Sequence, residues 1–268
     1  MKWINVEGTA YWSIFITVFL AVAVWESVRA RRALAASPES RWSRHGLLFI
    51  VAMVVQSLVF RISPIALAVS VEDAPYGLLN KAAIPFIIRC ALAILLIDFV
   101  HYLSHRAFHS FSWLWRIHQV HHSDPDYDVS TAARFHPLEV LLNQGVILAT
   151  VALVAPPPLA VLVAELLATA TNLFVHANAS LPLTLDRALR AIFVTPNMHR
   201  IHHSVEMTEQ QKNLGQALCW WDKLFGTYLS DSAGGEQGLT TGIADVESES
   251  TLKMAHLLGA PFQFRRNR

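Results

Sequence analysis

Three long apolar runs in the first hundred residues restrict this chain to a membrane-embedded fold. They cover residues 10–24, 46–60 and 82–100, and the third is long enough to cross about 30 Å of hydrocarbon as a helix. The first run is followed directly by the charged stretch "ESVRARR", whereas a secretory signal peptide carries its positive charge in front of the apolar run. We therefore predict an uncleaved membrane anchor followed by further membrane helices.

A fourth apolar run, residues 146–175, is interrupted by three prolines at positions 156–158. Proline does not continue a helix, because it lacks the backbone N–H and its ring clashes with the preceding turn. We expect this run to form two shorter helices folded into a hairpin. The predicted fold is all-α: an integral membrane helical bundle of about four membrane segments, one of them this hairpin, with a cytoplasmic histidine-rich helical cap.

The composition agrees with a membrane protein and excludes other classes. Only 15% of the residues are charged, against roughly a quarter in a soluble domain, and three separate apolar runs disfavour a large soluble helical core. The formal net charge of +1 provides no basic surface for nucleic acid. The two cysteines, Cys90 and Cys219, form no C-x-x-C pattern, which excludes a disulfide framework and a cysteine-held cluster.

The charges of the loops predict the orientation in the membrane. The connection between the first two runs contains five arginines, at positions 29, 31, 32, 41 and 44. Positively charged loops stay in the cytoplasm, and counting crossings from there brings the chain after residue 100 out on the same side. The return of the proline-broken hairpin brings the later histidines to that side as well. We therefore expect every histidine cluster to face the cytoplasm.

Histidine is the unusual residue type, because its copies are clustered at helical spacing. The pattern H-x-x-H-H occurs twice, in "RIHQVHH" and in "MHRIHH", and the stretch "HYLSHRAFH" precedes them. The clustered residues are His101, His105 and His109, then His118, His121 and His122, and finally His199, His202 and His203. Residues three and four apart lie on one face of a helix, so we expect each triplet to converge on one point.

This pattern predicts a metal site. Imidazole binds iron, zinc, copper and nickel, and facing helices of a bundle can hold two metals between them. The clusters offer enough nitrogen atoms for two ions, and ligation by nitrogen without cysteine makes iron the leading candidate for oxygen chemistry.

Two other functions remain open on the residues alone. A membrane metallohydrolase would need a carboxylate near the metal, and Glu139 and Glu165 are the acids in the right region, although neither triplet has the glutamate of H-E-x-x-H. A metal transport or storage protein would line several membrane helices with histidines or acids, yet the first two apolar runs contain none.

The order of the motifs resembles a known family. The stretches "DFVHYLSHRAFH", "LWRIHQVHHS", "RFHPLE", "FVHAN", "TPNMHRIHHS" and "NLGQALCWWDKLFGTY" are similar to those of the fatty acid hydroxylase and sterol desaturase superfamily of membrane di-iron enzymes. The resemblance covers residues 97–229. Between Trp113 and Tyr228 the spacing is especially like that of the bacterial sterol desaturase family and the alkylglycerol monooxygenase branch.

The resemblance implies the domain organisation, the ligands and the cofactors. Residues 1–96 would form N-terminal transmembrane helices, residues 97–230 the di-iron catalytic region and residues 231–268 a polar C-terminal tail. The cofactors would be two iron ions, replaced by zinc on overexpression, with dioxygen as co-substrate. The implied metal ligands are His105, His109, His118, His121, His122, His176, His199, His202 and His203.

Other residues near the motifs receive weaker predictions. His101 ranks below the ligands, because relatives often have tyrosine there. His136 either joins the site or, as we favour, supports a ligand or caps a helix, whereas His45 and His256 are expected to be ordinary exposed residues. Asp98 would accept a hydrogen bond from the second nitrogen of a ligand or pair with Arg89 or a neighbouring lysine.

Asn172 departs from the pattern of some relatives, which have a histidine at that position. It lies four residues before His176, so on a helix both side chains would point at the same metal. An amide is a weak ligand for iron, and we predict that Asn172 holds a water molecule on one iron.

The resemblance implies the function. The chain would use dioxygen and external electrons to hydroxylate or desaturate a C–H bond of a lipid (fatty acyl, sterol-like or ether lipid). The electrons would come from a ferredoxin-like or cytochrome b5-like donor or from a reductase. The protein would lie in a bacterial inner membrane with its histidine site facing the cytoplasm.

Overall fold

The computed structural model describes residues 2–79, 84–244 and 253–263. Residues 82–83 of the third predicted run, and residues 245–252 and 264–268 of the predicted tail, lie outside this description. In the described residues the fold is helical, and the β-structure there consists of isolated bridges. The prediction of an all-α fold is confirmed.

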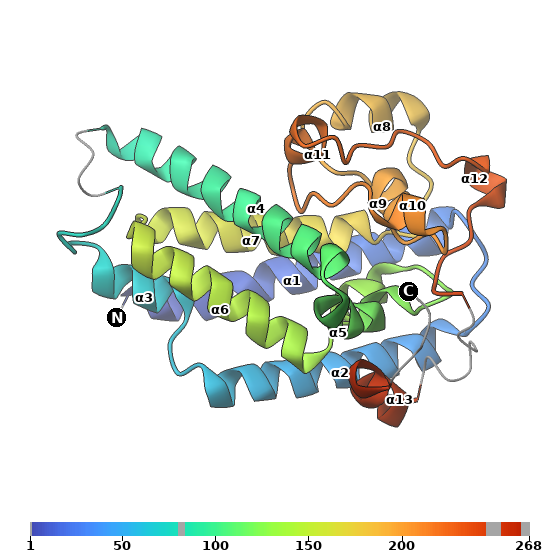
Figure 1. Ribbon diagram of the computed structural model, residues 1–268, viewed down its shortest axis with the longest axis horizontal. Coiled ribbons are helices and arrows are strands. Elements are labelled where there is room, and N and C mark those ends of the chain that lie inside the picture. The colour runs from blue at the N-terminus through green and yellow to red at the C-terminus, as the bar shows by residue number, and fades with distance from the viewer. Residues whose placement is uncertain (1, 80–83, 245–252, 264–268) are drawn as a thin grey trace.

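Five helical segments are long and apolar enough to cross a membrane (Figure 1). They are α1 (Lys2–Arg29), α2 (Pro38–Val59) together with α3 (Pro64–Val71), α4 (Phe86–Ser110), α6 (Pro137–Val154) and α7 (Pro158–Val175). The predicted hairpin is therefore present as α6 and α7. It begins at Pro137 rather than at residue 146, because the polar residues Asn143 and Gln144 conceal the first two turns of α6 in the hydropathy pattern.

Prolines and hydroxyl side chains set the helix boundaries. The side chains of Ser37 and Ser63 accept hydrogen bonds from the backbone N–H groups of Ser40 and Ala66, and a proline follows each serine. A capping serine followed by proline is a strong start signal. At the end of α6, Ala155 adopts a left-handed conformation with φ of 48°, which turns the chain into the proline run 156–158, whose last member begins α7.

The outer surface of the bundle is apolar, as lipid requires. Along α1, exposed hydrophobic side chains recur at every fourth residue, with 52–74% of each side chain exposed: Ile16, Leu20, Val24 and Val28. Ile50, Val54 and Leu58 make a similar stripe on α2. Inside, α1 packs on α7, α2 packs on α6, and α4 packs on both α6 and α7.

The remaining helices gather at one end of the bundle, where α1, α4 and α7 end and α2 and α6 begin (Figure 1). This end contains α5 (Ser112–His122), η1 (Val129–Ala133), α8 (Leu183–Leu189), α9 (Pro196–His202), α10 (Met207–Gln210), α11 (Trp220–Leu224), α12 (Gly235–Gly238), α13 (Met254–Gly259) and η3 (Ala260–Phe262). They form the predicted histidine-rich helical cap.

The division at residues 96 and 230 stays a prediction, and close packing crosses both positions. Helices α1 and α2 lie directly on α7 and α6. In the predicted tail, the fully buried Leu257 packs against Leu48 and Val120, and Thr241 forms a bridge with Ser204. The described part of the tail therefore helps to hold α5 in place.

Candidate metal centre

The nine predicted ligands all come together, in two groups. His105, His109, His118, His122 and His202 form the five-histidine group, and His121, His176, His199 and His203 form the four-histidine group. Within each group the ligand nitrogens lie within 4.8 Å of one another. Both groups are buried apart from the half-buried His105.

The two H-x-x-H-H triplets do not each converge on one point, so that expectation is wrong. In α5, His118 and His122 join the five-histidine group while His121 joins the four-histidine group. In α9 the split is reversed, because His199 and His203 join the four-histidine group while His202 joins the other. With 3.6 residues per turn, positions i+3 and i+4 point about 100° apart, so each triplet supplies both groups.

Backbone carbonyls fix the orientation of several imidazoles. The Nδ1 atoms of His105, His176 and His202 lie 2.9, 2.7 and 2.9 Å from the carbonyl oxygens of Leu214, Asn172 and Lys212. A carbonyl only accepts, so Nδ1 carries the proton and Nε2 keeps its lone pair. Metal-binding histidines commonly have this arrangement.

Glu139 supports His118 in the same way, a role that was not predicted from the sequence. The Nδ1 atom of His118 donates to the Glu139 carboxylate at 2.7 Å, and Glu139 is buried at the start of α6. The sequence feature that could have indicated this role is the acidic residue of "RFHPLE", which lies in the first turn of α6. A carboxylate behind a histidine raises its basicity as a ligand.

The spacing of the nitrogens fits metal ions. The Nε2 atom of His176 lies 3.2 Å from Nε2 of both His121 and His199, and Nε2 of His118 lies 3.2 Å from that of His122. Two nitrogens that are each about 2.1 Å from one metal at a right angle would be about 3 Å apart. In the described part of the chain, Nε2 of His203 is buried with no hydrogen-bond partner.

Burial keeps these imidazoles neutral, as ligation requires. It lowers the pKa of His176 to about 4 and that of His202 to about 3. Burial, reinforced by the neighbouring histidines, also lowers the pKa of His121, His122, His199 and His203 well below the usual value. Buried neutral imidazoles whose Nε2 atoms face one another form clusters able to hold metal ions.

A buried charge network holds the end of α5, and it corrects the prediction for His45. His45 is fully buried rather than exposed: its Nε2 accepts from Arg134, and its Nδ1 donates to the Ser130 hydroxyl. Arg134 also donates to the carbonyl of Val120 and to the hydroxyl of Ser123, at 2.8 Å each. These contacts fix both ends of the segment that contains His121 and His122.

Asp98 is placed differently from both predictions. It accepts hydrogen bonds from the backbone N–H of Ala217 at 3.0 Å and from the indole of Trp221 at 2.8 Å, rather than from a ligand or Arg89. Asp222 similarly accepts from the N–H of Leu214 at 2.7 Å. The segment 217–222 is therefore held by buried carboxylates, and through Leu214 it positions His105.

The remaining candidates lie beside the groups rather than within them. His101 is outside both groups but faces the membrane cavity described below. His136 caps α6, since its Nδ1 accepts from the N–H of Leu138, as we favoured. The side chain of Asn172 donates to the carbonyl of Ala132 at 2.9 Å and lines the same cavity. His256 is half-buried on α13.

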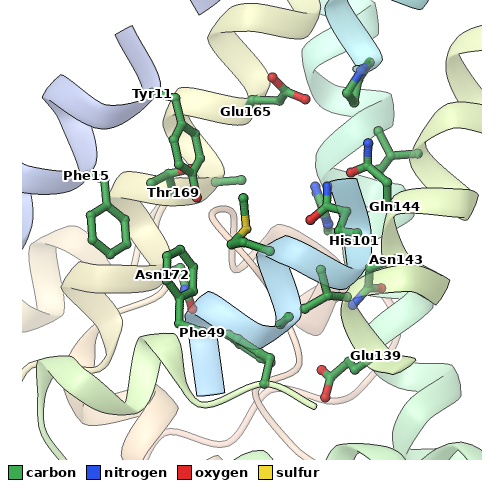
Figure 2. Close-up of a pocket in the computed structure, with 18 of the residues that line it drawn as sticks. Tyr11, Phe15, Phe49, His101, Glu139, Asn143, Gln144, Glu165, Thr169 and Asn172 are labelled. Atoms are coloured by element: carbon green, nitrogen blue, oxygen red, sulfur yellow. The ribbon is translucent and has the colours of Figure 1, made fainter. Parts of the chain in front are cut away.

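A cavity of about 930 Å³ leads from the histidines into the bundle, between α1, α2, α4, α6 and α7 (Figure 2). His105, His118, His121, His176 and His199 line its inner end. Its walls combine aromatic side chains such as Phe15 and Phe49 with polar ones such as Glu165 and Gln144. A long, flexible molecule in this cavity would reach both histidine groups from within the membrane.

The amino-acid sequence around the histidine groups is similar to those of known proteins. Residues 90–227 match the family model described as fatty acid hydroxylase. Ornithine lipid hydroxylase OlsE of Rhizobium tropici is 31% identical over 147 residues, which is 54% of this chain and 43% of that protein. The alkylglycerol monooxygenase of Homo sapiens is 32% identical over 148 residues, 55% of this chain and 32% of that protein. That of Caenorhabditis elegans is 33% identical over 135 residues, 50% of this chain and 26% of that protein.

The chain spans less than half the length of each of these relatives. No solved structure matches it. The family match covers half of the chain and includes all nine grouped histidines, and the chain therefore belongs to the fatty acid hydroxylase family.

Proposed function

We propose that this protein is a membrane oxygenase that hydroxylates or desaturates a C–H bond of a lipid, whether a fatty acyl, sterol-like or ether lipid. The observation that carries the proposal is a cavity that lies between the candidate membrane helices and is lined at one end by members of both buried histidine groups. The relatives named hydroxylase and monooxygenase support the same reaction class.

The five-histidine group would hold one iron and the four-histidine group the other, with zinc entering on overexpression. Two irons would supply the power to oxidise an unactivated C–H bond with dioxygen. The protein holds the ligands in one tautomer through Leu214, Lys212, Asn172 and Glu139. The cavity walls would keep water away from the site and align one carbon of the substrate, which would lower the entropic part of the barrier.

Both outcomes need two electrons and two protons from outside. Hydroxylation would place one oxygen atom of dioxygen in the C–H bond and release the other as water. Desaturation would remove two hydrogens from neighbouring carbons and release both oxygen atoms as water. We propose that the donor is a ferredoxin-like or cytochrome b5-like protein, or a reductase.

We further propose that the histidine groups face the cytoplasm of a bacterial inner membrane. Support comes from the arginines that connect α1 and α2, because positively charged loops stay in the cytoplasm. Arg29 ends α1 and Arg41 lies in the first turns of α2, at the same end of the bundle as α5 and α9 (Figure 1). A soluble electron donor could reach the site there.

The test is the lipid extract of a deletion strain compared with that of the wild type. We expect the deletion strain to lack at least one wild-type lipid and to contain its precursor, which differs in mass by one oxygen atom or by two hydrogens. Complementation with the wild-type gene should restore the missing lipid. Turnover by the purified zinc protein without dioxygen would point to a hydrolase instead, and metal flux in vesicles would point to a transporter.

Replacing Glu139 by alanine is expected to weaken metal binding in the five-histidine group. The substitution leaves Nδ1 of His118 without its acceptor, and loss of such a partner costs roughly 10–100-fold in metal affinity or activity. Glu139→Gln keeps an acceptor oxygen and should fall between the two. The measurement is iron per chain after dialysis against a graded chelator, and equal retention in all three proteins would contradict the assigned role.

Asn172→Leu is expected to reduce turnover while leaving the metal content nearly intact. The amide nitrogen is held by Ala132, so the oxygen is the atom available to hold a water beside the four-histidine group, and losing such support costs on the order of 10–100-fold in activity. Asn172→His should keep both metals and some activity. Unchanged turnover in Asn172→Leu would show that the side chain holds no functional water.

A further inference from the structure

One face of α7 carries polar side chains from the four-histidine group into the membrane. Glu165, Thr169, Asn172 and His176 follow one another at steps of four, three and four residues, so they share a helix face, and all four line the cavity. Figure 2 shows the first three directed toward the cavity. At 1.5 Å per residue, Glu165 lies about 16 Å from His176 along the helix.

Other helices add polar groups around Glu165. Tyr11 on α1 lies beside Thr169, and Gln144 on α6 lies across the cavity from Tyr11 (Figure 2). A site for a plain hydrocarbon chain would be lined by apolar side chains. Polar groups that face such a chain would lose their hydrogen bonds to water without replacement, which is unfavourable. The wall therefore suits a substrate with polar atoms of its own.

Glu165 has no partner of opposite charge. In the described parts of the chain it forms no hydrogen bond or ion pair, and the charged group that acts on it is another acid, Glu7. Glu7 itself accepts from the Ser63 hydroxyl at 2.7 Å. Arg61 is a positively charged residue that also lines the cavity, but among the described residues it makes no ion pair with Glu165 or Glu7. An acid at membrane depth is costly and by default marks a functional interior.

Resting on the proposed lipid-oxidising function, we propose that Glu165 is a specificity-determining residue that binds an amine group of the substrate. An ammonium group would neutralise Glu165 and relieve its repulsion by Glu7, and the Tyr11 and Thr169 hydroxyls are placed to accept its remaining hydrogens. The substrate class is a lipid with a cationic nitrogen that enters the cavity. Its amine and its reacting carbon lie about 16 Å apart, the distance from Glu165 to His176 along α7.

The test measures binding rather than turnover. Purified protein in one detergent is titrated with hexadecylamine, hexadecanol or hexadecane, and the thermal unfolding midpoint reports binding, because a ligand of the native state raises it. We expect hexadecylamine to bind the wild type about 10–100-fold more tightly than it binds Glu165→Gln, the range of a hydrogen bond to a charged group. Binding of hexadecanol should change less than about threefold between the two proteins, the effect of a neutral hydrogen bond at its weakest.

Glu39→Gln is the matched control, because Glu39 is exposed in the first turn of α2 and outside the cavity. It should bind hexadecylamine like the wild type. If Glu165→Gln does not fold, Glu165→Asp keeps the charge and should retain most of the preference for the amine. Equal binding of hexadecylamine by the wild type and Glu165→Gln would overturn the proposal.

The readout separates this proposal from the proposed function. Binding needs neither iron nor dioxygen, so selective binding without lipid oxidation would defeat only the proposed function. Lipid oxidation without any preference for the amine would defeat only the role of Glu165. When the purified enzyme does oxidise hexadecylamine, we expect the change far from the nitrogen, and oxidation of the carbon next to the nitrogen would contradict the placement.

Discussion

Replacing His203 by alanine is expected to abolish turnover and to remove about one metal ion per chain. His203 lies in the four-histidine group, and its Nε2 atom is buried with no hydrogen-bond partner among the described residues. Its loss leaves three histidines, so the effect should exceed the 10–100-fold that removal of a supporting hydrogen bond costs. His122→Ala should do the same to the five-histidine group. The measurements are iron per chain and turnover with the same lipid extract.

His256→Ala is the control for these variants. His256 lies on α13, outside both groups, and its removal should leave the metal content and turnover near those of the wild type. Full activity of His203→Ala with both metals retained would show that the second H-x-x-H-H does not bind metal.

Arg41→Met is expected to destabilise the folded protein by about 3–5 kcal/mol, the effect of leaving a buried charge without its partner. The Arg41 guanidinium is fully buried and pairs with Asp124 at 2.6 Å and with Asp128 at 3.0 Å. Methionine would fill the space but leave both carboxylates without that partner. Since Asp124 follows His122 by two residues, the metal content should fall as well.

Arg44→Met separates this effect from the loss of one positive charge. Arg44 lies one turn further along α2 and is exposed, so its substitution should change the unfolding midpoint by little. The comparison uses thermal unfolding in detergent. Equal midpoints for Arg41→Met and the wild type would show that the buried network contributes nothing to stability.

The family match covers the histidine groups but not the first three helices. The family match begins at residue 90, so it includes the histidine groups but not α1, α2 or α3. Those helices contribute Tyr11, Phe49 and the Glu7–Ser63 pair to the cavity wall. The two histidine groups therefore lie within the family match, whereas part of the cavity wall comes from helices outside it.

Local signals in the sequence predict the helices and the set of clustered histidines. The proline run at 156–158 marks the hairpin, and the i, i+3, i+4 spacing places imidazoles on common helix faces. The division of each triplet between two groups depends instead on how α5 and α9 face each other. That arrangement is set by contacts far apart in the sequence, such as those of Arg134 with His45 and Val120.

The roles of single polar residues were the least predictable. The sequence predicts that His45 is exposed and that Asp98 accepts a hydrogen bond from the second nitrogen of a ligand. Both residues are instead buried, with partners 85 or more residues away. Glu139 could be a catalytic acid from its type and position, and only its 2.7 Å contact with His118 shows that it orients an imidazole of the five-histidine group. A titratable side chain has several compatible partners, and the fold selects among them.

Metal analysis of protein purified without oxygen tests the central claim most directly. The claim is that five histidines hold one iron and four hold another, so the active protein should contain two irons per chain. His203→Ala and His122→Ala should each contain about one, and the double variant should contain none. A wild-type preparation with full activity and one iron or none would contradict the proposed di-iron oxygenase.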